Sequence, residues 1–536
     1  MRRVLAALIA VTVLAGCTVE KAPPPLPVRS GPPVTLRVLA GSELADMQPV
    51  LDEAAKATGV SVTMDLIGSL EGAETVATGR ADGRYDALWF SSNRYLETLP
   101  EAKQRLGNAA RIMGSPVVLG VRPATAQRLG WTGGAVTWTD IAAVAGRGEL
   151  TFAMTDPAAS NTGFSALVAV ASALDGSGRA LDAAAIDRVA APLTAFFSGQ
   201  RITAGSSGWL TDAFTGRMTG TDPGPAVDGL ITYEASLLGL NASGRLPEQL
   251  TVIRPGDGVV SADYPLTLMT GASTGARDAH ERLAAYLRGA AVQDRIVRET
   301  WRRPAVTGVT LPAELPAAPA ELSFPDTREA IDALLTAYQD RLRRPSRTVY
   351  VLDVSGSMKG DRIRQLKTAL AGLTGLNTSL TGESCRFRSR EEVVLLPFSS
   401  KPAAAQRFTV DATDPRPSRE RMRAAVGRLS AGGDTAVYDS LAAAYRELDG
   451  AADTNRFTSI VLMTDGESNR GRALADLLTV VKRRPANAEP VPVFPVLFGE
   501  AAESQMRQVA EATGGELWDA RGGDLTRAFC QIRGYQ

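Results

Sequence analysis

The stretch TVYVLDVSGSM, residues 348–358, decides the fold of the C-terminal part of this chain. Its first five residues form a continuous run of the kind found in a strand that a parallel sheet buries on both faces. The run leads directly into an acidic residue and two serines. The segment after it predicts a helix, because apolar residues recur along one face: Ile363, Leu366, Leu370 and Leu373.

Three more strand-like runs follow, separated by helical segments: Val393–Phe398, Ser459–Thr464 and Val493–Leu497. This alternation predicts an α/β fold, a doubly wound sheet with helices on both faces. We expect the last run to be irregular or at an edge, because proline cannot donate a hydrogen bond to a neighbouring strand. Ligands of such sheets bind beyond the carboxyl ends of the strands, so the residues there are the candidates for a site.

Five oxygen-bearing side chains lie at or between these strand ends: Asp353, Ser355, Ser357, Thr435 and Asp465. Two carboxylates and three hydroxyls suit a small, hard cation such as Mg²⁺, or Mn²⁺ in its place. The alternative is that the serines only cap the helix and the first acid only anchors the turn. The nearby acids Asp434 and Asp439 are expected in a loop and on a helix surface rather than as ligands.

The pattern Asp-x-Ser-x-Ser, then a distant Thr and a distant Asp, resembles the metal-ion-dependent adhesion site of the von Willebrand factor A domain. The resemblance covers about residues 347–532. It implies a Rossmann-like domain whose bound metal takes a carboxylate of a protein partner at its open position. It also places Cys385 and Cys530 on neighbouring elements, so we expect a disulfide in an oxidising compartment, with two buried free thiols as the alternative.

The N-terminal half alternates short apolar runs with amphipathic helical segments, which again predicts an α/β architecture with parallel sheets. The runs that we interpret as strands are Thr35–Ala40, Ser61–Leu66, Ala87–Phe90, Val117–Val121 and Leu230–Tyr233.

Small hydroxyl residues follow several of these strands or precede a helix: Ser42, Ser69, Ser91 and Ser160. Helix N-termini offer free N–H groups, so several that meet at one crevice would bind a small anion or polar solute. Each serine alone could equally be an N-cap. Together with residues 85–90, 156–163, 263–266 and 291–293, the series resembles the two-lobed, type II bacterial extracellular solute-binding proteins. That resemblance covers about 34–303 and implies two α/β lobes, crossover strands between them and a ligand in the cleft.

The N-terminus predicts the compartment. Arg2 and Arg3 precede the apolar run Val4–Val13, which ends in Leu-Ala-Gly-Cys17 and resembles a bacterial lipobox. We therefore expect a signal peptide over 1–16, a lipid on Cys17 and a Pro-rich stalk over 17–33. A Pro/Ala-rich linker over 304–326 would separate the domain at 34–303 from the one at 327–536. The protein would then be anchored to the cell membrane on its extracytoplasmic face.

Composition excludes several classes of function. The 536 residues hold 58 basic and 58 acidic side chains, which gives no electrostatic case for nucleic acid. One histidine and three cysteines leave little for a zinc site or a Ser-His-Asp triad. We therefore expect no enzyme but a lipid-anchored binding or adhesion protein, with a carboxylate-bearing protein and a small polar or anionic solute as partners. The alternative is the solute receptor of an ABC importer with an accessory A domain.

Overall fold

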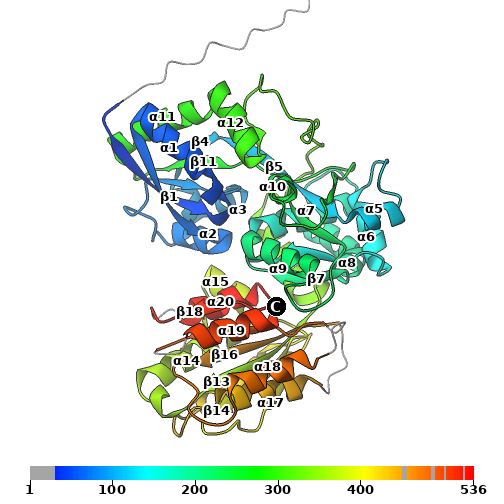
Figure 1. The fold of residues 1–536 in the computed structure, drawn as a ribbon. Helices are drawn as coiled ribbons and strands as arrows, with labels where there is room; N and C mark the ends of the chain where they lie inside the picture. Colours follow the sequence, from blue (N-terminus) through cyan, green and yellow to red (C-terminus); the bar gives the residue numbers. More distant parts are fainter. Residues whose placement is uncertain (1–30, 450–454, 485–488, 500–502, 523–524) are drawn as a thin grey trace, which may run out of the picture.

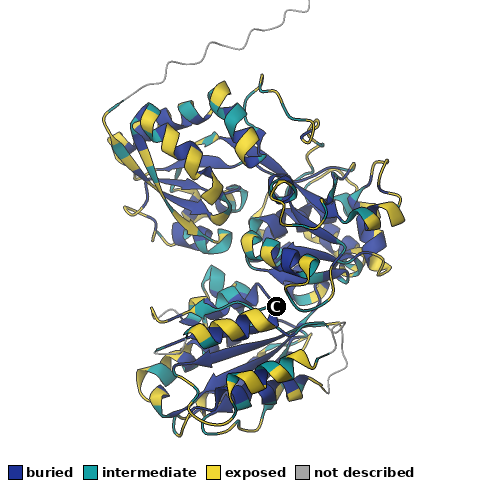
Figure 2. Cartoon of the chain, viewed as in Figure 1, coloured by how far each residue is buried: buried dark blue, intermediate teal, exposed yellow. Residues whose placement is uncertain are grey.

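The computed structural model describes residues 31–449, 455–484, 489–499, 503–522 and 525–536. Three sheets, each covered by helices, form two lobes side by side and a third domain below them (Figure 1). The central strands are buried within each body, whereas edge strands and the covering helices carry exposed residues (Figure 2). The expected α/β class is confirmed.

The first lobe has a five-stranded sheet of order β2-β1-β3-β11-β4. Its strands are β1 (Val34–Gly41), β2 (Val60–Ile67), β3 (Ala87–Trp89), β4 (Leu106–Arg111) and β11 (Pro265–Met269). Its helices are η1 (Ser42–Met47), α1 (Gln48–Thr58), α2 (Ser69–Ala77), α3 (Arg94–Thr98), α4 (Pro100–Lys103), α11 (Thr274–Leu287) and α12 (Ala290–Thr300). Strands β2, β1 and β3 are parallel, but β11 is antiparallel to both of its neighbours. The sheet is therefore mixed and not wholly parallel as expected, because β11 returns from the other lobe.

The second lobe has the order β10-β5-β8-β6-β7, with β9 and β12 also paired to β5. Its strands are β5 (Met113–Val121), β6 (Phe152–Thr155), β7 (Gln200–Ala204), β8 (Gly229–Tyr233), β9 (Thr251–Ile253), β10 (Ser261–Ala262) and β12 (Arg303–Pro304). Its helices are α5 (Pro123–Arg128), α6 (Trp138–Gly146), α7 (Asn161–Asp175), α8 (Ala183–Phe197), α9 (Ser207–Thr219) and α10 (Glu234–Ala242). This sheet is also mixed, since β5 runs antiparallel to β8.

The chain passes between the lobes at three places within residues 34–304: from β4 to β5, from β10 to β11 and from α12 to β12. Ser91 stabilises the second passage, because its carbonyl accepts hydrogen bonds from Asp263 N and Tyr264 N, both at 3.0 Å. In Figure 1 these passages lie near α12 and the end of β5, away from the third domain.

The segment after β12 lies against the second lobe. Leu315 is buried, and Val259 forms a bridge with Glu321. The next helix, α13 (Arg328–Ala337), continues into η2 (Tyr338–Leu342), and both pack on α8. Residues 304–326 are thus attached to a surface, and α13, which lies inside the range 327–536 expected for the last domain, packs on the second lobe.

The third domain has a six-stranded sheet of order β15-β14-β13-β16-β17-β18. Its strands are β13 (Ser346–Asp353), β14 (Glu392–Phe398), β15 (Gln406–Thr409), β16 (Phe457–Thr464), β17 (Val493–Leu497) and β18 (Trp518–Asp519). Its helices are η3 (Gly356–Met358), α14 (Asp361–Ala371), η4 (Gly372–Leu376), α15 (Leu380–Cys385), α16 (Arg416–Gly427), α17 (Val437–Asp449), α18 (Leu474–Lys482), α19 (Glu503–Thr513) and α20 (Leu525–Arg533).

The edge position, one of the two alternatives expected for Val493–Leu497, is wrong. β17 lies inside the sheet, because β18 pairs with it at Val496 and Leu497, beyond Pro495. Pro495 is therefore paired only with β16. β18 is too short to extend alongside the proline, so none of the described strands lies on that side of it.

The predicted lipid anchor and most of the predicted stalk belong to the N-terminus. Cys17, the signal peptide and residues 17–30 of the stalk fall outside the described residues. Among the residues that are described, none of the helices combines the length and the apolar character needed to cross a bilayer.

Candidate functional sites

The first candidate site lies where β13 and β16 end at the carboxyl edge of the third sheet. Asp353, the last residue of β13, is fully buried. Its Oδ1 accepts a hydrogen bond from Ser355 N at 2.8 Å, and its Oδ2 accepts one from Thr464 Oγ1 at 2.7 Å. The carboxylate is therefore fixed between two adjacent strand ends.

A chain of hydroxyls joins this carboxylate's turn to the second one. Ser355 Oγ lies 3.0 Å from Ser357 Oγ, and Ser357 Oγ donates to Asp465 Oδ1 at 2.7 Å. The other oxygen of Asp465 accepts from Arg362 at 2.7 Å. Four of the five residues expected as metal ligands are thus connected side by side.

The loop that carries Thr435 is hydrogen-bonded to the turn that holds Ser355 and Ser357. Gly356 N donates to Gly433 O, and Gly432 N donates to Val354 O, both at 2.8 Å. Gly433 has a φ of +89°, and a Cβ there would lie 2.9 Å from Ser400 Oγ, so glycine is required. Thr435 itself is buried, and its N–H donates to Asn469 Oδ1 at 2.9 Å.

The two acids expected to be bystanders lie apart from this network. Asp434 pairs with Arg470 at 3.0 Å, and Asp439 pairs with Arg472 at 2.7 Å. Each therefore has a cationic partner of its own at the surface.

The electrostatics of the site suit a cation. Burial raises the pKa of Asp353, hydrogen bonds from Ser355 and Thr464 oppose the rise, and the neighbouring Asp465 carboxylate adds to it. Arg362 balances one of the two negative charges, and its side chain is 35% exposed, so it could turn out to water at little desolvation cost. Among the described residues no group of three or more His, Cys, Asp or Glu is placed to hold a metal, so a metal here would depend on hydroxyl ligands. An all-oxygen set with excess negative charge fits Mg²⁺ or Mn²⁺.

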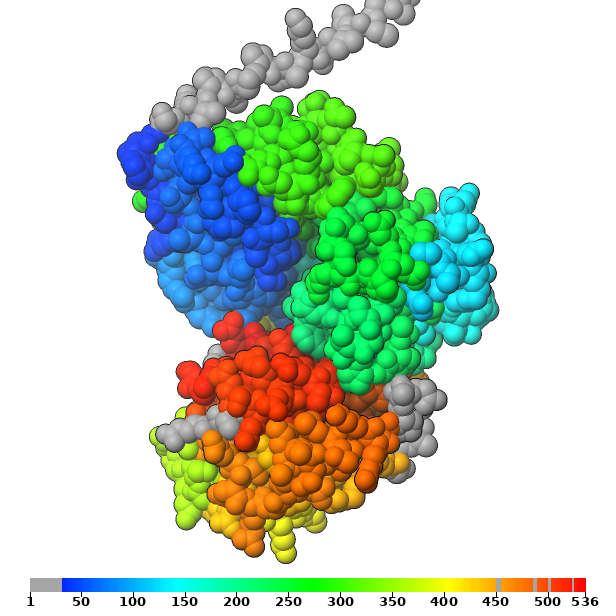
Figure 3. Space-filling view, in the orientation of Figure 1, coloured from blue at the N-terminus to red at the C-terminus, as the bar shows by residue number. Residues whose placement is uncertain are grey.

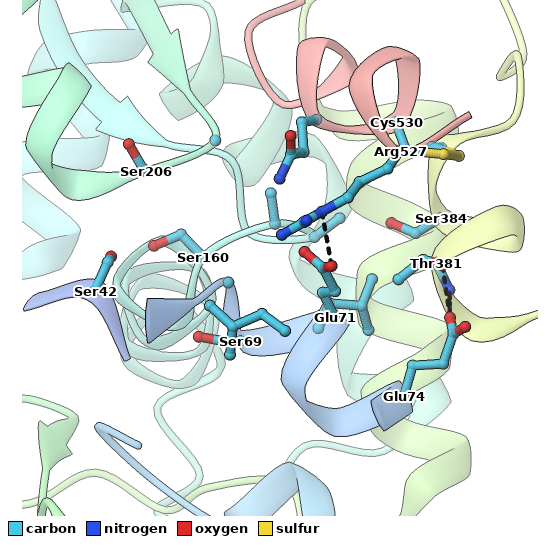
Figure 4. Close-up of a pocket in the computed structure, with 18 of the residues that line it drawn as sticks. Ser42, Ser69, Glu71, Glu74, Ser160, Ser206, Thr381, Ser384, Arg527 and Cys530 are labelled. Carbon is cyan, nitrogen blue, oxygen red and sulfur yellow. Dashed lines mark hydrogen bonds and ion pairs between the residues drawn. A yellow bond between two sulfur atoms is a disulfide. The ribbon is translucent and has the colours of Figure 1, made fainter. Parts of the chain in front are cut away.

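The second candidate site is a cavity of about 420 Å³ between the two lobes, and the third domain forms a further part of its wall (Figure 4). All four serines singled out from the sequence line it: Ser42, Ser69, Ser91 and Ser160. They come from η1, α2, the end of β3 and the start of α7, so four segments far apart in sequence meet at one space.

The alternative that these serines only cap helices can be tested against their side-chain hydrogen bonds. Ser160 is the N-cap residue of α7, yet within the described chain its side chain makes no capping hydrogen bond to that helix. Ser206 does cap its helix, since its Oγ accepts from Trp209 N. The hydroxyl of Ser160 is thus not committed to α7, unlike that of Ser206 to α9.

Two ionisable groups set the polarity near the serines. Burial raises the pKa of Glu43, although its own backbone N–H and the charge of Arg302 oppose the rise. Burial also raises the pKa of Tyr233 to about 12, and Tyr233 Oη accepts a hydrogen bond from Asn161 Nδ2 at 2.8 Å. Hydroxyl and amide groups therefore surround the predicted serines, whereas Glu71, Glu74, Arg80 and Arg527 bring charged groups to the rest of the lining.

Sequence reasoning missed part of the lining. Ser206 and Ser207 lie between β7 and α9, which is the same strand–hydroxyl–helix signal as at the other serines, but β7 was not among the expected strands. Thr381 and Arg527 also line the cavity, and they belong to the third domain. No local signal in the sequence indicates that this domain borders the cleft.

Cys385 and Cys530 form a disulfide in the structure, with their Cα atoms 5.0 Å apart. The bond joins α15 to α20, the two helices that face the lobes. It therefore fixes the third domain's contribution to the cavity wall.

Comparisons with known proteins match each half separately. A model of the family described as bacterial extracellular solute-binding protein matches residues 36–302, and a model of the von Willebrand factor type A domain matches 349–518. No curated protein matches the chain.

Among solved structures, the sulfate-binding protein SubI from Mycobacterium tuberculosis H37Rv is 18% identical, with a TM-score of 0.41 over 56% of this chain and 98% of that one. A periplasmic thiamin binding protein is 14% identical, with a TM-score of 0.45 over 59% and 99%. A von Willebrand factor type A protein from Catenulispora acidiphila is 21% identical, with a TM-score of 0.29 over 36% and 42%. The chain thus spans less than half the length of the last of these relatives.

Proposed function

Because this chain joins an extracellular solute-binding domain to a von Willebrand factor type A domain, we propose that it is an extracytoplasmic binding protein that grips a protein partner through a divalent metal. The metal would be held by Asp353, Ser355, Ser357, Thr435 and Asp465. When bound, Mg²⁺ or Mn²⁺ would offer a coordination position to a carboxylate of the partner. Cys17 would carry the lipid that tethers the protein to the membrane.

One observation carries this proposal: the hydrogen-bonded chain from Asp353 through Ser355 and Ser357 to Asp465. It brings carboxylates at the ends of two strands to one edge of a sheet, and Arg362 offsets only one of their two negative charges. The hydroxyls add oxygen ligands without adding negative charge.

Calorimetric titration of the full chain with Mg²⁺ and with Mn²⁺ tests the metal site. Asp353→Ala should lose metal binding, because it removes a charge and the anchor of Ser355. Thr435→Ala removes one neutral oxygen and should only weaken binding. Asp434→Ala is the matched control, since that exposed acid pairs with Arg470 and should leave binding unchanged. Retained metal binding by Asp353→Ala would contradict the site.

The partner is tested by capture of envelope proteins on the immobilised full chain. Proteins captured with Mg²⁺ but lost both with EDTA and on the Asp353→Ala chain would be metal-dependent partners. Capture that EDTA does not affect would contradict the proposal.

A second function is favoured by the cavity between the lobes. The four serines that line it would suit a small polar or anionic solute, as in the receptor of an ABC importer. A thermal-shift screen against small anions, sugars and amino acids tests it, and the full chain must be used because the third domain supplies part of the cavity wall. A ligand at 100 times its Kd should stabilise the fold by about 2.7 kcal/mol.

A further inference from the structure

The third domain lies across the open side of the cleft. In Figure 3 the C-terminal helix lies directly below the two lobes, at the place where they come together. The cavity is lined by residues of all three bodies, such as Glu71 of the first lobe, Ser206 of the second and Arg527 of the third domain. The wall of the candidate solute site is therefore shared.

The contacts with the second lobe are apolar and close. The ring of Tyr535 lies 4.6 Å from that of Trp209, and Ile532 belongs to the same buried cluster as Ile202 of β7. A Cβ at Gly534 would lie 2.8 Å from the Cα of Gly205, so the two backbones touch. These contacts attach the third domain to the second lobe through a shared buried cluster.

The contacts with the first lobe combine apolar packing with polar pairs. Leu380 of α15 packs against the buried cluster of the first lobe. Glu74 of α2 accepts hydrogen bonds from Thr381 N at 2.7 Å and from Thr381 Oγ1 at 2.6 Å. One turn earlier, Glu71 forms an ion pair with Arg527 of α20 at 2.8 Å. Figure 4 shows these two contacts side by side, on the edge of the cavity opposite the serines.

We propose that these two contacts, Glu74–Thr381 and Glu71–Arg527, form a latch by which the A domain limits how far the lobes can separate. The lobes are linked to each other at the far side of the cleft, near α12 and β5, so separation would be greatest at the mouth. The third domain moves with the second lobe, so the first lobe can swing only when the latch breaks. The proposal concerns the regulation of the same cleft as the proposed solute site, but its test needs no solute.

The test measures the distance between the lobes in the full chain. Spin labels at Ser61→Cys and Ala143→Cys, two exposed positions on β2 and α6, report it by pulsed electron resonance in a Cys17→Ser background. Arg527→Glu places like charges opposite each other and should add a population of longer distances. Exchanging the charges, Glu71→Arg with Arg527→Glu, should restore the original distance.

A control variant and a salt dependence test whether the Glu71–Arg527 contact causes the change in distance. Arg507→Glu makes the same charge change on α19, where the partner is Glu503 in the same helix, and should leave the distance unchanged. At 1 M salt the Debye length falls to about 3 Å, which weakens the attraction between Glu71 and Arg527 once they have separated. High salt should therefore shift the unaltered chain toward longer distances. If Arg527→Glu impairs folding, Arg527→Gln replaces it. An unchanged distance in both Arg527 variants, the same shift in Arg507→Glu, or a charge exchange that fails to restore the distance would overturn the latch.

Discussion

Residues of one type take different roles here according to their surroundings. Ser42 and Ser91 both follow a strand directly, yet Ser42 is exposed whereas Ser91 is only 2% exposed. Ser91 uses its carbonyl to hold a passage between the lobes, and Ser160 begins α7 without capping it. The type of a residue determines which hydrogen bonds it can form, and its surroundings determine which of them form.

Ser160 tests the cleft at this scale. Ser160→Phe should abolish stabilisation by the anion that gives the largest thermal shift in the screen, because the larger side chain fills space between the lobes. The melting temperature without ligand should change little, since the hydroxyl does not cap α7. Ser177→Phe, an exposed serine outside the cavity lining, is the control. Unchanged affinity in Ser160→Phe would place the ligand elsewhere.

His280 predicts a pH dependence of stability. It is buried on α11, its Nε2 lies 3.0 Å from Leu266 O, and burial lowers its pKa. The unfolded chain, with a histidine pKa of about 6.5, then binds the proton more readily, so stability is complete above that pH and declines as pH falls through the folded-state pKa. Melting temperatures from pH 7 to 5 should fall less steeply for His280→Gln, and equal slopes would contradict this account.

At the scale of elements, pairing partners determine what a segment becomes. Proline in and before β17 predicted an irregular or edge position, but a two-residue strand on its far side places it within the sheet. Likewise α15 is a short helix of six residues whose position depends on its disulfide to α20 and its contact with α2. Neither feature follows from local propensity, because both depend on segments that are distant in the chain.

The disulfide between α15 and α20 can be checked directly. Alkylation without reductant should add no label at Cys385 or Cys530, as judged by intact mass and peptide mapping. Because the sequence separation is 145, Cys385→Ala with Cys530→Ala should lose about 4–5 kcal/mol on the chain-entropy model. Two labels on the unreduced protein would mean that the bond is absent.

At the scale of the whole molecule, the bodies share cores rather than merely touching. The second lobe and the third domain contribute to one hydrophobic cluster, and α13 belongs to the core of the second lobe. Tyr338 lies 5.0 Å from Phe197 of α8, ring to ring. The lobes therefore extend beyond the region that carries their own strands.

Truncation tests this extended boundary. A chain ending at 326 should unfold at a lower temperature than one ending at 344, because it lacks the buried residues Ile331, Leu334, Tyr338 and Leu342. Each buried side chain contributes roughly 1.5–3 kcal/mol, so the difference should be several kcal/mol. Equal melting temperatures would mean that α13 and η2 add nothing to the second lobe.

The sequence by itself determined the α/β class, the two families and the order of polar residues at strand ends. Those features are local: an apolar run and the serine or aspartate after it lie within a few residues of each other. The tertiary structure alone decided that Ser206 joins the four predicted serines at the cavity, that β17 is internal and that Arg527 borders the cleft of another domain. These depend on packing between segments up to several hundred residues apart, which no periodicity in the chain encodes.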